Sequence, residues 1–241
     1  MSPKSKAKRP KLPFVLVNMA MTADGKIATA NRAVHSFSSR RDLDQLYELR
    51  ATADAVMCGA RTVEISRSIL GTGGERFRQR RRQRGLNEYN LRVIVSGSGS
   101  IDPRAPIFKE HFSPVIILTT ARASKTKLLN LRTIANDVRV CGKREINFPE
   151  ALRRLRAEWG VRRLLCEGGG ELNDALLRAD LVDELHLTIC PKIFGGKEAP
   201  TIADGQGVCT LAEATMLQIS QFRLIGDEVY AVFRRKVPRR N

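Results

Sequence analysis

The chain of 241 residues predicts an α/β domain with a mixed, mostly parallel and twisted sheet that helices cover on both faces. Two observations support this class. In the middle of the chain, short apolar runs alternate with segments of helical periodicity, which is typical of parallel strands joined by helices. Near the end, two apolar runs at residues 216–224 and 229–233 flank Gly226 and Asp227, which predicts a closing antiparallel hairpin.

The individual elements follow from local signals along the chain. Apolar runs bounded by glycine, proline or polar turn residues predict strands at residues 14–20, 54–59, 91–96, 114–119, 137–141, 161–166 and 182–190. Ser38 or Ser39 can N-cap a helix that ends at Arg50. A second helix is expected at residues 149–159, because a proline is well placed in a first turn, and a third at residues 171–178.

The net charge of +17 is concentrated in three segments. Residues 1–11, 75–84 and 234–241 each have a net charge of +5, so the rest of the chain is nearly neutral. Such basic runs are usually solvated and hold polyanions only nonspecifically. We expect a disordered basic tail at residues 1–12 and one domain at residues 13–233, with a basic surface insertion at residues 70–90. A second basic tail is expected at residues 234–241.

Composition excludes several classes of protein. No apolar run approaches the roughly 20 residues that span a bilayer, and no signal-peptide pattern follows the basic N-terminus. The cysteines are far apart and form no CxxC pair, so neither a zinc site nor a thioredoxin-type motif is indicated. We therefore expect a cytoplasmic protein with no membrane association and no bound metal.

A run of three glycines is the most informative motif. An apolar run ends at Glu167, Gly168 to Gly170 follow, and a helix is expected from Glu171. Glycines let the backbone approach a ligand closely, and the free N–H groups of a first helical turn favour an anion such as a phosphate. The spacing matches neither GxGxxG nor a Walker loop. Taken alone, the motif also fits an ordinary tight connection between a strand and a helix.

Four segments in register resemble one known family. They are residues 18–28 (NMAMTADGKIA), 49–63 (LRATADAVMCGARTV), 167–172 (EGGGEL) and 181–196, which begins LVDEL and ends PKIFGG. In this order and spacing they resemble the pyrimidine reductases of riboflavin biosynthesis. The resemblance covers residues 14–233 and implies a dihydrofolate-reductase-like fold, with three layers in the order α/β/α.

The resemblance also implies a reaction. Family members are NADPH-dependent reductases that act on a ribosylamino-pyrimidinone 5′-phosphate. The ribose opens to an imine, and a hydride reduces its C1′ to give the ribitylamino product. Some members are fused to a zinc deaminase, but no H-x-E with P-C-x-x-C occurs here. We therefore expect the stand-alone form that reduces the 2,5-diamino compound, with the homodimeric state that is usual in the family.

The residues that match functional positions of the family fall into three groups. Glu167 is the expected catalytic residue, as an acid or an orienting carboxylate. The expected substrate-binding residues are Asn18, Lys26, Arg50 and Arg67. The expected cofactor-binding residues are Asp24, Gly25, Gly59, Thr62, Ser66, Gly168, Gly169, Gly170, Glu171 and Leu172. Simpler roles stay open for several of them: an ordinary turn at Asp24-Gly25, a solvated Lys26 or Arg50, and a helix N-cap at Thr62.

One departure bears on the substrate. The family has an Asp-Asp-Pro sequence shortly after the segment that ends at Val63, and Ser66 and Arg67 replace its aspartates here. A cation in place of a carboxylate inverts the local charge and favours a more anionic ligand. A related reductase with another pterin-like or pyrimidine substrate is thus one alternative. A nucleic-acid-binding protein on a catalytically silent scaffold is the other, although few aromatic residues are interleaved with the basic runs.

Overall fold

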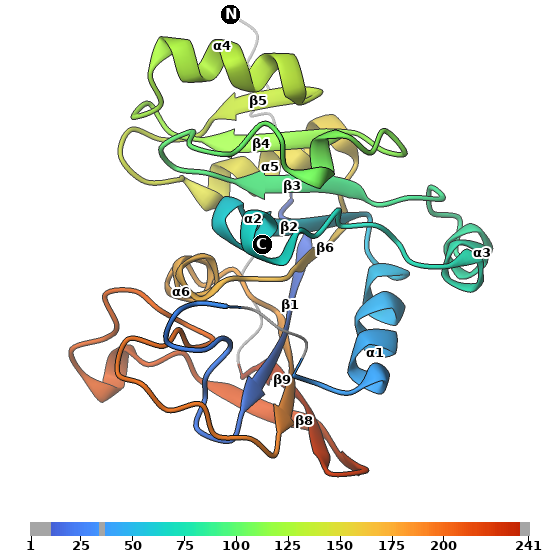
Figure 1. Cartoon of the computed structure of the whole chain (residues 1–241), viewed down its shortest axis with the longest axis vertical. Coiled ribbons are helices and arrows are strands. Elements are labelled where there is room, and N and C mark those ends of the chain that lie inside the picture. Colours follow the sequence, from blue (N-terminus) through green and yellow to red (C-terminus); the bar gives the residue numbers. More distant parts are fainter. Residues whose placement is uncertain (1–10, 34–36, 237–241) are drawn as a thin grey trace, which may run out of the picture.

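The computed structural model describes residues 11–33 and 37–236, and within them nine strands form one sheet (Figure 1). The strand order is β5-β4-β3-β2-β6-β1-β7-β9-β8. The bounds are β1 Phe14–Thr22, β2 Ala55–Gly59, β3 Leu91–Val95, β4 Val115–Thr119, β5 Asp137–Val140, β6 Arg163–Cys166, β7 Glu184–Cys190, β8 Leu217–Ile225 and β9 Glu228–Arg235. Strands β1 to β7 pair in parallel and the β8–β9 hairpin is antiparallel, which confirms the expected mixed sheet.

Six α-helices connect these strands in the described part of the chain. Their bounds are α1 Arg40–Arg50, α2 Ala60–Ser66, α3 Glu75–Gln83, α4 Lys125–Ile134, α5 Phe148–Trp159 and α6 Gly170–Arg178, with 3₁₀ turns at Pro106–Phe108 and Leu211–Glu213. The three expected helices are confirmed, and Ser39 is the N-cap of α1, since its side chain accepts a bond from the backbone N–H of Asp42. Helices α2, α3 and α4 were not among the expected helices.

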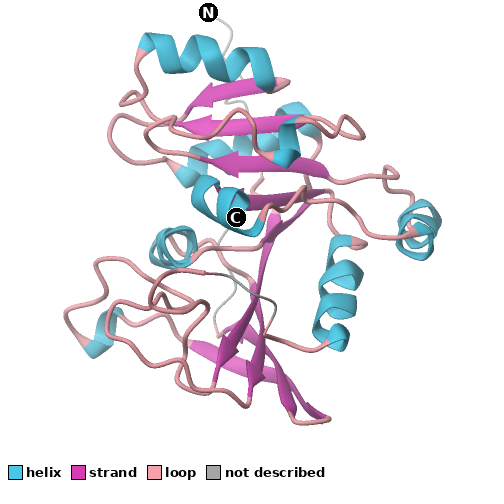
Figure 2. Ribbon diagram, viewed as in Figure 1, coloured by secondary structure: helices cyan, strands magenta, loops and turns pink. Residues whose placement is uncertain are grey.

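Two apolar cores lie on opposite faces of the sheet. Because side chains alternate along a strand, Val15 and Val17 of β1 pack in one core with α5 and α6, whereas Leu16 packs in the other with α1, α2 and α4. In Figure 1, α2 lies in front of the strands and α5 behind them, and Figure 2 shows the same layers by element type. The three-layer arrangement is confirmed.

The basic segment at residues 75–84 is a helix that is partly buried. Phe77 and Arg81 of α3 are both buried. The guanidinium of Arg81 donates through Nη1 to the backbone oxygens of Arg50 (2.7 Å) and Ala53, and through Nε to that of Asn87 (2.7 Å). This segment is therefore more than a surface insertion, because it holds the end of α1 in place.

Both expected tail boundaries need correction. Strand β9 runs to Arg235, and Arg234 Nε lies 2.9 Å from Glu184 Oε1, so Arg234 and Arg235 belong to the sheet. Leu12 packs against the core. The remaining tail residues, 1–10 and 237–241, lie outside the described residues. No helix in the described ranges is long and apolar enough to span a bilayer.

Candidate active site

A large cleft opens at the carboxyl ends of the parallel strands. Its volume is about 2060 Å³. Residues that follow parallel strands meet at the same edge of a sheet, so segments far apart in the sequence line it together. The sequence-predicted residues that line it are Asn18, Arg50, Gly59, Thr62, Ser66, Arg67, Glu167, Gly169, Gly170, Glu171 and Leu172. Four others do not: Asp24, Gly25, Lys26 and Gly168.

The glycine turn between β6 and α6 is tightly packed. Gly168 has φ +75°, and a Cβ there would lie 2.8 Å from Met19 Sδ. A Cβ on Gly170 would lie 2.5 Å from the backbone oxygen of Thr201. The Gly168 oxygen also accepts a 2.9 Å hydrogen bond from the N–H of Gly59. A side chain at Gly170 would displace the backbone of Thr201, and the left-handed φ of Gly168 favours glycine there.

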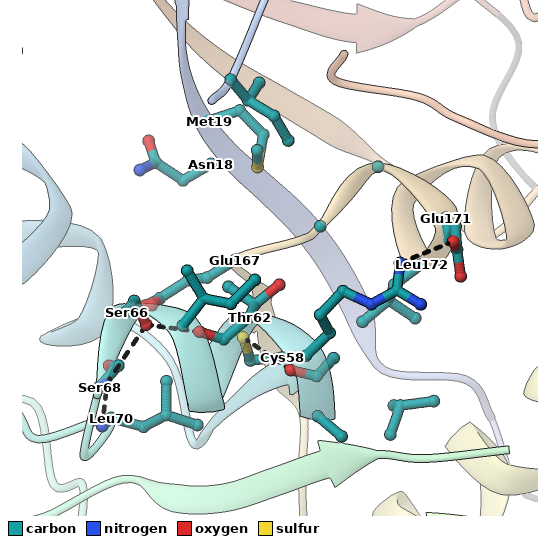
Figure 3. Close-up of a pocket in the computed structure, with 18 of the residues that line it drawn as sticks. Asn18, Met19, Cys58, Thr62, Ser66, Ser68, Leu70, Glu167, Glu171 and Leu172 are labelled. Carbon is teal, nitrogen blue, oxygen red and sulfur yellow. Dashed lines mark hydrogen bonds and ion pairs between the residues drawn. The ribbon is translucent and has the colours of Figure 1, made fainter. Parts of the chain in front are cut away.

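Helix α6 begins directly after this turn and presents its N-terminus to the cleft. Its N-cap is Gly169, which has no side chain to satisfy the first-turn N–H groups. The N–H groups of Glu171 and Leu172 belong to that turn. The Glu171 side chain is exposed and pairs with Arg61 at 3.3 Å (Figure 3). The backbone here suits an anionic group of a ligand.

Helix α2 forms the wall opposite the turn. Its N-cap is Gly59, so the N-cap role considered for Thr62 is wrong. A Cβ on Gly169 would lie 3.2 Å from Thr62 Oγ1, which places this hydroxyl against the turn. Ser66 Oγ instead donates to the Thr62 backbone oxygen at 2.7 Å (Figure 3). Arg67 ends α2 in a left-handed conformation, is exposed, and pairs with no described residue.

Arg50 and Glu167 form a buried ion pair at the centre of the cleft. Arg50 Nε and Nη2 each lie 2.6 Å from one carboxylate oxygen of Glu167, and the side chains are 7% and 11% exposed. Burial alone lowers the pKa of Arg50, but the attraction of Glu167 outweighs it and the net shift is upward. A solvated surface role for Arg50 is therefore wrong.

This pairing limits what either group can do. Arg50 Nη1 also donates to the Gly71 oxygen at 2.5 Å, so one N–H on each terminal nitrogen remains for a ligand. Both oxygens of Glu167 accept hydrogen bonds from Arg50, which fixes the orientation of this side chain in the cleft.

The turn at Asp24 organises a neighbouring loop. The Asp24 carboxylate accepts bonds from Thr22 Oγ1 (2.5 Å) and from the N–H of Gly195 (2.7 Å), and the Thr22 bond is the main cause that lowers the pKa of Asp24 to about 2. Gly25 has φ +79°, which favours glycine. Lys26 Nζ donates to the Ala199 oxygen at 3.2 Å.

Sequence reasoning missed some residues that line the cleft. Asp42 lines it from the first turn of α1 and is buried. Its helical spacing with Leu46, Leu49 and Arg50 places it on the inward face of the helix, which is a signal the sequence contains. Ser98 and Arg122, which follow β3 and β4, also line the cleft.

The sequence matches the family described as RibD C-terminal domain over residues 13–230. The chain belongs to this family. It is 33% identical over 217 residues to the 2,5-diamino-6-ribosylamino-4(3H)-pyrimidinone 5′-phosphate reductase of Methanothermobacter thermautotrophicus, covering 90% of this chain and 95% of that protein. The reductase of the same name from Archaeoglobus fulgidus is 32% identical, with 80% and 87% covered.

Longer relatives and solved structures agree with this assignment. The riboflavin biosynthesis protein RibD of Actinobacillus pleuropneumoniae is 27% identical, and the match covers 91% of this chain but 56% of RibD. A pyrimidine reductase-like protein from Corynebacterium diphtheriae has a TM-score of 0.75 at 21% identity, covering 92% of this chain and 91% of that one. The shared fold of this RibD-family chain is thus the one its sequence predicts.

Proposed function

We propose that this RibD-family chain is an NADPH-dependent reductase that converts a ribosylamino-pyrimidinone 5′-phosphate to its ribitylamino form in riboflavin biosynthesis. The main support is the match to archaeal reductases of that name over nearly the full length of both chains. The cleft supports it too, because an uncapped helix N-terminus and an ion pair line one cavity.

The glycine turn fits the pyrophosphate of a dinucleotide. Uncapped N–H groups at the start of α6 suit its charge, and the absence of a side chain at Gly169 leaves room beside Thr62. The bound nicotinamide would supply the hydride. Past the ends of β3 and β4, Ser98 and Arg122 line the same cleft, and a hydroxyl with a guanidinium suits a phosphate monoester. This is the reason to propose NADPH over NADH.

The substrate phosphate is best assigned to Arg67. Its guanidinium is exposed and has no described partner, whereas Arg50 is held by Glu167 and Gly71. We assign the Arg50–Glu167 pair to orienting the ribosyl group, with Asn18 beside it on the cleft wall.

A homodimer and a cytoplasmic location complete the proposal. The edge strand β8 exposes Ile219, Phe222 and Leu224 by 62 to 68%, and an apolar edge strand favours association with a second chain. The described cysteines are free thiols, which suits a reducing compartment.

The test combines the diaminopyrimidine substrate with NADPH and follows oxidation of the nicotinamide and formation of the ribitylamino product. Gly169→Val should abolish nicotinamide oxidation and product formation. It should also abolish the thermal stabilisation by NADPH, which at a 100-fold excess over Kd corresponds to about 2.7 kcal/mol. Gly74→Ala is the matched control, because a Cβ there meets no atom within 4 Å. A melting temperature of the folded wild-type protein that NADPH does not change contradicts the proposal.

A further inference from the structure

Asp42 is a buried carboxyl group that lacks a hydrogen-bond partner on one oxygen. It is 8% exposed and lines the cleft from the first turn of α1. Its Oδ1 is buried and accepts no hydrogen bond within the described residues, and the nearby Thr188 Oγ1 is buried and unpartnered as well. Burial raises the pKa of Asp42 by more than the nearby hydroxyls of Thr188 and Ser38 lower it.

Asn18 provides a second acceptor of the same kind. It is 8% exposed, and its Oδ1 is likewise buried and unpartnered within the described ranges. It lies two residues after Leu16 on β1, and so on the face of the sheet that α1 covers. In Figure 3 the Asn18 side chain points away from Met19, toward the pale blue helix α1. Two unpartnered acceptors therefore line the same part of the cleft.

The two buried oxygens without hydrogen-bond donors destabilise the protein in the absence of a ligand. Native proteins satisfy nearly all buried polar groups, and an unsatisfied one costs about 1–3 kcal/mol. The same face of the sheet is apolar under α2 and α4, so packing alone does not require polar residues here. A ligand that presents N–H donors would satisfy both oxygens. A ligand that presents carbonyl oxygens would leave them unpaired and would repel them.

We propose that Asp42, with Asn18 beside it, binds the N–H edge of the substrate base and makes this enzyme specific for a 2-aminopyrimidinone over the corresponding uracil. The inference rests on the proposed function. A 2-amino-4(3H)-pyrimidinone carries an amino group at C2 next to the N3–H, and these N–H groups can donate to the Asp42 carboxylate and to Asn18 Oδ1. In the uracil, the C2 carbonyl faces the carboxylate instead, and the mismatch leaves two acceptors opposed.

The other titratable groups around Asp42 are engaged with one another. Glu228 of β9 is the acidic neighbour, and its two oxygens accept bonds from Ser39 (2.7 Å from the backbone N–H and 2.6 Å from Oγ) and Tyr230 (2.7 Å). Burial raises the pKa values of Tyr230 and Cys190 to about 12 each. Glu228 is thus engaged by its own partners, whereas Asp42 keeps an oxygen that no described group satisfies.

The decisive experiment compares two substrates with one isosteric variant. The wild-type enzyme should favour 2,5-diamino-6-ribosylamino-4(3H)-pyrimidinone 5′-phosphate over 5-amino-6-(5-phosphoribosylamino)uracil by about 10²-fold or more in kcat/KM. Asp42→Asn replaces one oxygen with an N–H donor that can face the uracil C2 carbonyl. The preference should then fall to within about tenfold of unity, through both a loss on the first substrate and a gain on the second.

The control and the contrary outcomes separate this inference from the proposed function. Asp44→Asn, on the same helix but paired with Arg76 at the surface, should keep the wild-type preference. A variant Asp42→Asn that melts normally and keeps the wild-type preference overturns the inference and leaves the proposed function standing. Failure of the wild-type protein to reduce either compound overturns the proposed function itself.

A binding measurement on the wild-type protein adds a second readout that needs no variant. The N–H edge of the diamino ribitylamino product can donate to the Asp42 carboxylate, whereas the uracil product presents a carbonyl oxygen there, so the diamino product should bind more tightly. Calorimetric titrations of the wild-type protein with the two products measure this difference in affinity. Equal binding of the two products contradicts the assignment.

Discussion

Helix α3 and the cleft both contain arginines paired with acids, yet the two regions differ in burial. On α3 the pairs lie at the surface, and they include Arg76–Asp44, Arg78–Glu75, Arg80–Glu48 and Arg82–Glu88. In the cleft, Arg50 and Glu167 are buried and come from positions 117 residues apart. Exposed pairs contribute about 0–1 kcal/mol each, whereas removal of one partner of a buried pair costs about 3–5 kcal/mol. The density of arginines along the sequence therefore does not locate the functional charge.

The comparison also bears on the nucleic-acid alternative. Four arginines of α3 are paired with acids and Arg81 is bonded to backbone oxygens, so this segment offers few free cations to a polyanion. The cleft provides a built site for a small anionic ligand instead. This contrast favours the reductase over a nucleic-acid-binding role.

The largest expected effect comes from breaking the buried pair. Glu167→Ala should destabilise the protein by about 3–5 kcal/mol, because it leaves the Arg50 charge buried and unpaired. Urea denaturation measures this loss. The double variant Arg50→Met with Glu167→Leu should recover most of the stability and none of the catalysis. A double variant that keeps wild-type kcat/KM would show that the pair is structural only.

A smaller effect is expected at the one arginine of α3 that resembles Arg50. Arg81→Met should cost about 1–2 kcal/mol, since the Asn87 carbonyl loses its donor. The carbonyls of Arg50 and Ala53 keep bonds from Asn90 Nδ2, at 2.8 and 2.6 Å, which limits the loss. Thermal and urea unfolding measure the change. A loss of stability as large as that of Glu167→Ala would mean that α3 and the buried pair of the cleft contribute to stability as one coupled unit.

The pH dependence of stability tests a third cluster at the opposite end of the sheet. The hydrogen bond from His186 is the main cause that lowers the pKa of Glu184 to about 2, with Arg234 adding to it. A carboxyl with a depressed pKa stabilises the folded state above its unfolded value, and that contribution is lost as pH falls from about 4.5 toward about 2. The difference in urea midpoint between the wild-type protein and Glu184→Gln should therefore shrink over this range. A difference that is constant with pH contradicts the assignment.

The smallest effect is expected at the exposed pairs. Arg80→Gln removes the contact with Glu48 and should change stability by less than about 0.5 kcal/mol. Its kcat/KM should equal that of the wild-type enzyme, because Arg80 does not line the cleft. Steady-state kinetics and unfolding on the same preparation check both. Arg78 is the residue of α3 that lines the cleft, so a tenfold catalytic loss on changing Arg80 would mean that the surface pairs of α3 also act on the site.

The sequence alone was enough for the order of the strands, for three of the helices and for the glycine turn. Alternating apolar runs, the N-cap at Ser39 and the final hairpin are local signals, and local signals are visible in a single sequence. Helix α4 was missed because only Leu131 of its residues is buried, so its apolar pattern is weak. Helix α3 was missed because one of its buried residues is Arg81, and an analysis of apolar periodicity counts arginine as exposed.

The tertiary structure alone decided which charges meet. The sequence predicted substrate-side roles for Arg50 and Glu167 but not their contact with each other, because that contact depends on α1 packing against the end of β6. It likewise assigned no role to Asp42, whose burial against β7 and β9 depends on how α1 lies on the sheet. Periodicity reports which face of an element is apolar. It does not report which distant group lies opposite, and that contact determines whether a charged residue is solvated, paired or left for a ligand.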